Sequence, residues 1–258
     1  MDFSDKVVLI TGASGGIGAI CAVDFAKLHA KLSLVGRNED KLNNVVDQCE
    51  KASGIKPLAV IADISKAEDI SRIIKDTINQ YGKLDVLVNN AGMLIMAGVL
   101  DDISNYDRIS ATNVRGPYML TQQAVPHLIK TKGNIVNVSS VLSTVTIPAM
   151  APYCISKAAL DMFTKCMALE LASKGVRVNS VNPGPVTTDL FKSAGVPEHL
   201  IKDLYASTGS KLPLKKVAQS EDVSKMILFL ASDSCANCIT GSFHIIDCGL
   251  HLGQPVLM

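Results

Sequence analysis

A tyrosine and a lysine four residues apart are the residues of this chain best suited to proton transfer. Tyr153 and Lys157 lie in the segment "YCISK", which has helical character. Residues four apart share one face of a helix, so the lysine charge would act on the phenol. A nearby positive charge lowers the pKa of a tyrosine from about 10 and favours a general acid–base role. The pair alone also fits two residues that simply cover a helix surface.

Two adjacent serines compete for a place beside this pair. Ser139 and Ser140 end a predicted strand, and their side chains point to opposite sides if the strand continues there. Ser143 is nearer to the tyrosine, but it lies past the end of the strand. The strand pattern alone does not choose between the two adjacent serines.

Seven short β-rich runs alternate with helical stretches along the chain. The predicted strands cover residues 6–11, 31–36, 58–63, 84–92, 133–140, 177–184 and 241–247. The predicted helices cover residues 16–28, 39–52, 67–82, 104–131, 152–173 and 221–231. Continuous Val, Ile and Leu runs are typical of strands buried on both faces of a parallel sheet. The alternation predicts a doubly wound α/β fold, with a mostly parallel seven-stranded sheet and helices on both faces.

One irregular stretch interrupts a pattern that otherwise indicates a single domain over residues 1–258. No linker, change of composition or internal repeat divides the chain. Residues 187–216 follow the sixth strand and are divided by Gly and Pro into three pieces. Loops of this length are uncommon and often functional, so we expect a substrate lid there. An ordinary surface excursion is the alternative.

Glycines follow the first strand and open the first predicted helix, in the segment "LITGASGGIGAI". Gly12, Gly16 and Gly18 let the backbone turn tightly and approach a pyrophosphate, whose charge faces the helix N-terminus. Their spacing differs from the familiar G-x-G-x-x-G pattern, and a glycine cluster alone also fits an ordinary turn. The position between strand and helix favours a dinucleotide site.

The end of the second strand indicates which dinucleotide would bind. Sites selective for NAD place an acidic residue there for the ribose hydroxyls, whereas this chain has Gly36 followed by Arg37. The missing carboxylate removes repulsion toward a 2′-phosphate, and the guanidinium can pair with it. Both features predict NADP(H). A solvated cation at a helix start is the alternative for Arg37.

Composition excludes several other classes of protein. The 25 basic and 24 acidic residues balance to a net charge of +1, without the clustered positive charge of a nucleic-acid-binding protein. No apolar run approaches the ~18 residues of a membrane span, and the first residues do not form a signal peptide. Seven scattered cysteines favour reduced thiols in the cytoplasm. Cys235 and Cys238 form an isolated CxxC without further metal ligands, so we expect no metal site.

Four motifs occur in order, each at the carboxyl end of a predicted strand: "TGASGGIG", "NNAG", "YCISK" and "NPGPVTT". Together they closely resemble the short-chain dehydrogenase/reductase family, in its branch of about 250 residues, over almost the whole chain. The resemblance implies a Rossmann fold and an oxidoreductase. The family pattern Asp-Gly-Gly near the C-terminus is replaced by "DCGL", with Cys248 in the middle.

The resemblance also assigns residues to the cofactor and to the chemistry. The implied catalytic residues are Asn113, Ser140, Tyr153 and Lys157. The implied cofactor-binding residues are Thr11, Gly12, Ser14, Gly16, Ile17, Gly18, Arg37, Asp63, Ile64, Asn89, Asn90, Ala91, Gly92, Tyr153, Lys157, Val186 and Thr188. The family places its serine thirteen residues before the tyrosine, which selects Ser140 over Ser139.

The expected activity is NADP(H)-dependent hydride transfer between nicotinamide and a carbonyl or secondary alcohol. Apolar neighbours at residues 93–95, 141, 142 and 185 favour a small or lipophilic substrate. An NAD-dependent dehydrogenase for a hydroxylated lipid or steroid, and a catalytically silent NADPH-binding scaffold, are the alternatives. The resemblance further implies a homodimer or homotetramer formed by the helices over residues 104–131 and 152–173, with Leu160, Phe163 and Met167 facing a partner or the core.

Overall fold

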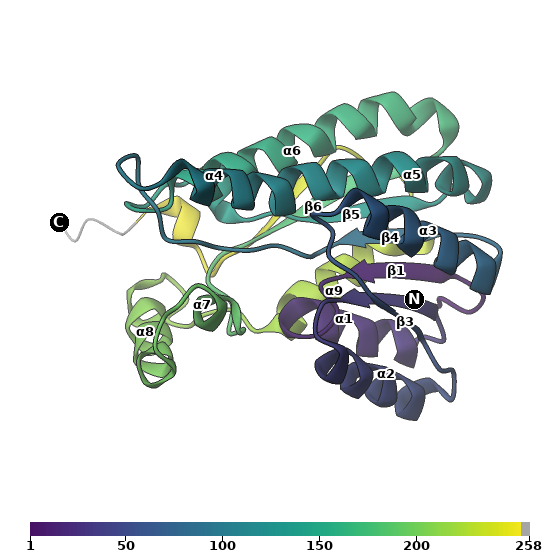
Figure 1. Ribbon diagram of the computed structural model, residues 1–258, viewed down its shortest axis with the longest axis horizontal. Coiled ribbons are helices and arrows are strands. Elements are labelled where there is room, and N and C mark those ends of the chain that lie inside the picture. Colours follow the sequence, from purple (N-terminus) through teal and green to yellow (C-terminus); the bar gives the residue numbers. More distant parts are fainter. Residues whose placement is uncertain (254–258) are drawn as a thin grey trace.

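The buried runs of the sequence form one seven-stranded sheet in the computed structural model, which describes residues 1–253 (Figure 1). Its strands are β1 Val7–Thr11, β2 Lys31–Gly36, β3 Leu58–Ile61, β4 Val86–Asn89, β5 Asn134–Val138, β6 Arg177–Pro183 and β7 Phe243–Ile246. They lie in the order β3-β2-β1-β4-β5-β6-β7, and every neighbouring pair is parallel. The predicted Rossmann fold is confirmed. Residues 254–258, the end of the predicted domain, lie outside the described residues.

Helices cover both faces of the sheet, as predicted (Figure 1). One face carries the helices α1 Gly16–Lys27, α2 Glu39–Ser53 and α9 Ser220–Ala231. The other face carries the helices α3 Ala67–Tyr81, α5 Gly116–Thr131 and α6 Ala151–Leu171. All five residues of β1 are buried, because this central strand is covered on both sides. The two apolar clusters hold the sheet rigid and leave its carboxyl edge free for a site.

The predicted helix over residues 104–131 is divided into three pieces. The helices α4 (Ile103–Ser110) and α5 are joined by a π-helical turn over Ala111–Arg115. Asn113 lies in the middle of this turn and is buried. Such turns are rare inside helices and frequently occur at functional sites. The interruption therefore falls on a residue that the sequence had already singled out.

The excursion over residues 187–216 is more regular than predicted. It contains the short helix α7 (Leu190–Ser193) and the 14-residue helix α8 (Glu198–Lys211). Gly209 weakens the helical pattern in the sequence but lies within α8. A Cβ on this glycine would lie 3.3 Å from backbone atoms of residues 216 and 217. Close packing against the returning chain explains a glycine inside a helix, so the prediction of an irregular stretch was wrong here.

The turn after β7 adopts an unusual backbone conformation. Cys248 has a φ of 55°, in the left-handed region that favours glycine, and Gly249 follows with a φ of 91°. The carbonyl of Cys248 accepts a hydrogen bond from the backbone N–H of Leu214 (3.2 Å). The C-terminal turn is thereby joined to the end of the excursion.

Two further features concern membranes and metals. Within residues 1–253, no helix is both long enough and apolar enough to cross a bilayer. The same range contains no group of three or more His, Cys, Asp and Glu side chains placed to bind a metal ion. Cys235, in the helix α10 (Asp233–Ala236), and Cys238 are exposed free thiols.

Candidate active site

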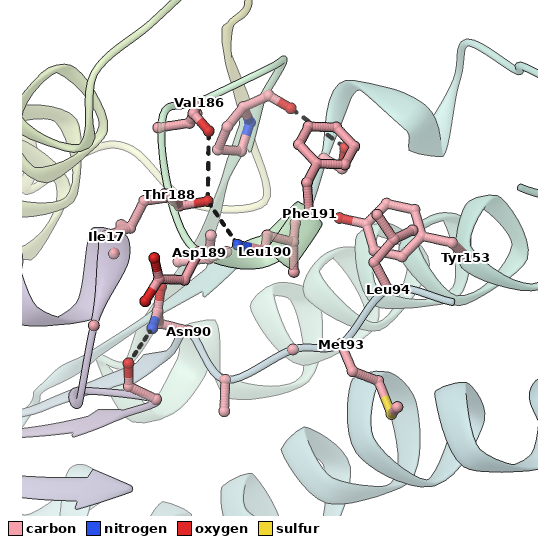
Figure 2. Close-up of a pocket in the computed structure, with 18 of the residues that line it drawn as sticks. Ile17, Asn90, Met93, Leu94, Tyr153, Val186, Thr188, Asp189, Leu190 and Phe191 are labelled. Atoms are coloured by element: carbon pink, nitrogen blue, oxygen red, sulfur yellow. Dashed lines mark hydrogen bonds between the residues drawn. The ribbon is translucent and has the colours of Figure 1, made fainter. Parts of the chain in front are cut away.

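A cavity of about 940 Å³ opens at the carboxyl edge of the sheet. Its walls come from the glycine turn after β1, the end of β2, the exits of β4 and β5, the start of α6 and the excursion. In open α/β sheets, ligands bind outside the carboxyl ends of the strands. Tyr153, Leu94 and Phe191 lie on one side of this cavity, and Ile17, Asn90 and Thr188 lie on the other (Figure 2).

Hydrogen bonds join the glycine turn to the exit of β4. The hydroxyl of Thr11 accepts from the backbone N–H groups of Asn90 and Ala91, each at 3.0 Å. The side-chain amide of Asn90 donates to the carbonyls of Thr11 (2.8 Å) and Gly12 (3.2 Å). Thr11 itself does not line the cavity. It shapes the turn from behind, and Asn90 forms the wall.

Close packing explains the glycines of this turn. A Cβ on Gly18 would overlap the carbonyl of Gly12 and lie 2.5 Å from Nδ2 of Asn90. Gly12 has a φ of 66°, and a Cβ on Gly16 would lie 3.2 Å from Cγ2 of Thr188. The open backbone at the N-terminus of α1 fits a dinucleotide pyrophosphate, which needs close approach and a positive helix end.

The end of the cavity beside the carboxyl ends of β2 and β3 fits an adenosine. Gly36 lies against Ser14, whose Oγ would be 3.2 Å from a Cβ on that glycine. The guanidinium of Arg37 is 73% exposed and lies 3.8 Å from the carboxylate of Asp63. Ile64 is buried beside them, and these residues all line the cavity. Arg37 is therefore free to turn toward a phosphate at this rim.

The structure distinguishes the two competing serines. The hydroxyl of Ser139 donates to the carbonyl of Lys157 (3.2 Å) and so serves to hold α6 against β5. The hydroxyl of Ser140 accepts from the backbone N–H of Leu142 (3.1 Å) and donates to the carbonyl of Pro183 (3.3 Å). The side chain of Ser143 is turned away to Asn182, at 3.2 Å. Of the three serines, Ser140 is the one whose hydroxyl influences the pKa of Tyr153.

Burial dominates the protonation of the tyrosine and the lysine. Burial raises the pKa of Tyr153 to about 12, and the hydroxyl of Ser140 acts in the opposite direction. Burial lowers the pKa of Lys157 to about 8, and the carboxylate of Asp161 opposes this change. Nζ of Lys157 donates to the carbonyl of Val138 (2.8 Å) and lies 5.6 Å from the ring centre of Tyr153. The expected lowering of the tyrosine pKa by its lysine is not found: burial raises this pKa, and the group that opposes burial is the hydroxyl of Ser140.

Asn113 acts from behind the cavity wall. Its side chain accepts from the backbone N–H of Met93 (2.8 Å) and donates to Met93 O (2.9 Å) and to the hydroxyl of Ser156 (3.1 Å). A Cβ on Gly92 would lie 3.5 Å from Oδ1 of the Asn113 side chain and 3.6 Å from Nζ of Lys157. Asn113 thus fixes the exit of β4 against α6, and Gly92 lies between its side chain and that of Lys157.

Most of the predicted site residues meet around the cavity, and four do not line it. Thr11, Gly18 and Asn113 lie directly behind its wall. Asn89 is placed in the interior, where its amide donates to Thr121 (3.2 Å) and Asn137 (2.9 Å). Ile95, expected near the reacting centre, is also outside the lining.

Tyr205 is a site residue that the sequence did not reveal. It lies in α8, is buried, and donates its hydroxyl proton to the carbonyl of Val186 (2.9 Å) while accepting from the N–H of Thr188 (3.2 Å). Its ring packs on Phe191 with centres 5.6 Å apart. Val186 and Thr188 line the cavity (Figure 2). One tyrosine thereby joins the excursion to the segment expected to hold the nicotinamide.

Removing the hydroxyl of Tyr205 is expected to loosen this segment. A Tyr205→Phe variant leaves the N–H of Thr188 without its partner, and the carbonyl of Val186 keeps only the longer bond from the hydroxyl of Thr188 (3.4 Å). A buried polar group without a partner costs about 1–3 kcal/mol. We expect KM for the cofactor to rise several-fold, together with a lower Tm. Steady-state kinetics and thermal unfolding measure both. Unchanged values of both would show that the hydroxyl does not hold the segment.

Known proteins resemble this chain over nearly its whole length. A family described as "Enoyl-(Acyl carrier protein) reductase" matches residues 12–251. A Thermotoga maritima protein described as an uncharacterized oxidoreductase is 38% identical over 256 residues, covering 96% of this chain and 98% of that protein. A short-chain dehydrogenase/reductase of unknown function from Caenorhabditis elegans, solved with cofactor, is 35% identical with a TM-score of 0.94, covering 98% of this chain and 97% of that one.

The chain belongs to the short-chain dehydrogenase/reductase family. This confirms the resemblance read from the four motifs, and it makes the protein an oxidoreductase. Another member, a 3-ketoacyl-(acyl-carrier-protein) reductase from Brucella melitensis solved with NADH, is 31% identical with a TM-score of 0.87 over 97% of this chain and 100% of that one. Nicotinamide cofactors are thus bound by structural neighbours of this short-chain dehydrogenase/reductase.

Apolar side chains form the part of the cavity beyond Tyr153. Leu94 and Met150 pack against Tyr153, and Leu142, Leu190 and Phe191 extend the same cluster. The excursion adds Val196, Leu200 and Leu204 to the lining. Among the residues of α8 that line the cavity in the described part of the chain, Thr208 alone carries a hydroxyl. This compartment of the short-chain dehydrogenase/reductase offers few polar partners to a ligand.

Proposed function

We propose that the protein is an NADP(H)-dependent oxidoreductase that interconverts a carbonyl and a secondary alcohol on a small or lipophilic substrate. One observation carries the proposal: a single cavity has Gly36 and Arg37 at one end and Ser140, Tyr153 and Lys157 at the other. The first pair suits a 2′-phosphate, and the second group suits proton transfer to an oxygen. The glycine turn between them suits the pyrophosphate.

The chain's own residues would divide the proton chemistry among them. A bound nicotinamide supplies or accepts the hydride. Ser140 holds the substrate oxygen, and Tyr153 gives its proton to that oxygen in reduction or takes it back in oxidation. The charge of Lys157 stabilises the tyrosinate that remains. Asn113 anchors the water that returns a proton to Lys157, and the buried position of Tyr153 keeps bulk solvent out of the exchange.

The composition of the compartment beyond Tyr153 supports a lipophilic substrate. Its walls are mainly Leu, Met, Ile, Val and Phe side chains from the β4 exit, the β5 exit and the excursion. A sugar or a charged acyl carrier would leave polar groups without partners against these walls, which costs free energy. The excursion serves as the substrate lid because α7 and α8 supply one of those walls.

An NAD-dependent dehydrogenase is the second candidate, because the carboxylate of Asp63 lies 3.8 Å from the guanidinium of Arg37 and competes with a 2′-phosphate for it. The NADH complex of the Brucella melitensis neighbour shows that this family also accommodates the unphosphorylated cofactor. A panel of aliphatic, steroid-like and sugar carbonyls, assayed with NADPH and with NADH, separates the two activities. Cofactor binding without turnover on any of them would identify a silent scaffold.

Replacing Arg37 is expected to change the cofactor preference. Arg37→Ala removes a charge-assisted hydrogen bond worth about 1.5–3 kcal/mol, so Kd for NADPH should rise about 10–100-fold while Kd for NADH stays nearly constant. Fluorescence titration measures both constants. Arg108→Ala is the matched control, because that arginine is exposed and outside the cavity. An equal loss for both cofactors would contradict a phosphate-binding role.

The proposal extends to assembly and location. The exposed apolar residues Tyr118, Ile155, Met162 and Leu169 on α5 and α6 support a homodimer or homotetramer formed through these helices. Leu160, a candidate for that surface, is instead buried in the protomer, and Phe163 and Met167 are half-buried. All seven cysteines are free thiols, which agrees with a cytoplasmic enzyme. Sedimentation of the purified protein tests the assembly.

A further inference from the structure

Asp161 is a buried carboxylate that has no part in the chemistry described above. It lies on α6, one helical turn after Lys157, and is 6% exposed. Burying a carboxylate is costly unless hydrogen bonds and an opposite charge compensate for the lost water. Its partners therefore indicate what it does.

Neutral groups from β6 hold the carboxylate in place. The side-chain amide of Asn182 donates to its two oxygens at 2.9 and 3.1 Å, and the hydroxyl of Ser180 lies 3.4 Å from one of them. The same amide of Asn182 lies 3.2 Å from the carbonyl of Ser140 and 3.2 Å from the hydroxyl of Ser143. One asparagine thus connects Asp161 to the backbone of the predicted catalytic serine.

The opposite charge comes from Lys157. Within residues 1–253, no cation lies within ion-pair distance of Asp161. Lys157 lies four residues earlier on the same face of α6 and is buried as well, so its charge acts on the carboxylate at longer range than a direct ion pair. Burial disfavours the charged form of Lys157, and the carboxylate favours it.

We propose that Asp161 is a positioning residue, whose buried negative charge keeps Lys157 protonated and whose bond to Asn182 holds the backbone at Ser140. This inference rests on the proposed function, because Lys157 must be charged to stabilise a tyrosinate at Tyr153. Each element that packs around Lys157 and Asp161 contributes groups that face these two residues. Tyr153 comes from α6, Ser180 and Asn182 come from β6, the carbonyl of Val138 comes from β5, and Asn113 comes from the π-helical turn. None of these groups other than Tyr153 titrates.

The pH profile of an Asp161→Asn variant tests the charge. In the wild-type enzyme, kcat/KM for NADPH-linked reduction should fall above the pKa of Lys157, about 8, as the lysine loses its proton. The amide keeps the size of the side chain and removes the carboxylate, so Lys157 should lose its proton at lower pH. We expect the alkaline limb to move down by about one pH unit. A limb that stays in place, with activity lowered equally at every pH, would show a merely structural role.

Two control variants test whether the shift of the alkaline limb comes from the charge of Asp161. Asp47→Asn neutralises an exposed carboxylate on α2, outside the cavity, and should leave the limb where it is. Asn182→Ala removes the amide link but keeps the charge, so it should lower kcat without moving the limb down. A downward shift in either control would overturn the assignment to Asp161.

If the Asp161→Asn variant does not fold, a measurement on the wild-type protein still tests the inference. NMR titration of the lysine side chains, with Lys157 assigned by its loss in Lys157→Met, gives the charge of Lys157 directly. Titration near pH 8 or above supports the inference, and titration well below pH 7 overturns it. This titration needs no turnover, so absence of activity across the carbonyl panel would refute the proposed function and leave the link between Asp161 and Lys157 testable.

Discussion

Replacing Tyr153 with phenylalanine is expected to lower kcat for carbonyl reduction by about 10²–10⁴-fold, the usual contribution of a general acid. The ring packs with Leu94, Met150 and Cys154 and would remain, so only the proton donor is lost. Kd for NADPH should change little, because the turn and the rim that suit the cofactor are untouched. Stopped-flow reduction and fluorescence titration with NADPH measure the two quantities separately.

Tyr118→Phe provides the matched control for this variant. Tyr118 is 52% exposed on α5, and the same hydroxyl is removed there at a distance from the cavity. Its turnover should equal that of the wild type. Near-wild-type turnover in Tyr153→Phe would refute the assignment of the proton donor, whereas joint loss of turnover and cofactor binding would indicate damage to the fold.

Replacing Gly18 with alanine is expected to lower both the thermal stability of the protein and its affinity for the cofactor. The new methyl group would overlap the carbonyl of Gly12 and press on the side chain of Asn90, so the glycine turn must move. Overpacking of this kind costs about 1–3 kcal/mol. We expect Tm to fall and Kd for NADPH to rise about tenfold or more, because the displaced turn forms the pyrophosphate end of the cavity.

Gly15→Ala tests whether the effect comes from packing rather than from any added methyl group. Gly15 has a φ of −178°, which any residue adopts, and a Cβ there would have nothing within 4 Å. Its thermal stability should match that of the wild type. Equal destabilisation of the two alanine variants would mean that the turn is sensitive to all change and that the contact with Gly12 is not the cause.

The arrangement of strands could be predicted because the strands carry their own pattern. The run Val7–Thr11 is apolar throughout, and such a strand is stable only at the centre of a covered parallel sheet. The order of the four motifs along the chain then brings Gly12, Ser140 and Tyr153 to one edge. Spacing also favoured Ser140 over Ser139, and the hydroxyl of Ser139 is bonded to the carbonyl of Lys157. The catalytic role of Ser140 stays a prediction.

Other features depend on contacts between distant parts of the chain and left no pattern in the sequence. The hydroxyl of Tyr205 reaches Val186 across 19 residues, and Asn182 reaches Asp161 across 21. The π-helical turn at Asn113 arises within a segment of ordinary helical residues. The pKa of Tyr153 was expected to fall because its lysine neighbour is visible in the sequence, whereas the burial that raises it is a property of the folded chain.

The strand order has a consequence for how the molecule is built. Starting from β1, each later strand joins an edge that is still exposed: β2 and then β3 on one side, β4, β5, β6 and β7 on the other. No strand has to insert between two that are already paired. Residues up to the end of β4 can therefore pair four of the seven strands and form most of the dinucleotide side before Ser140, Tyr153 and Lys157 leave the ribosome. Each later strand then adds to an exposed edge, which requires no rearrangement of strands that are already paired.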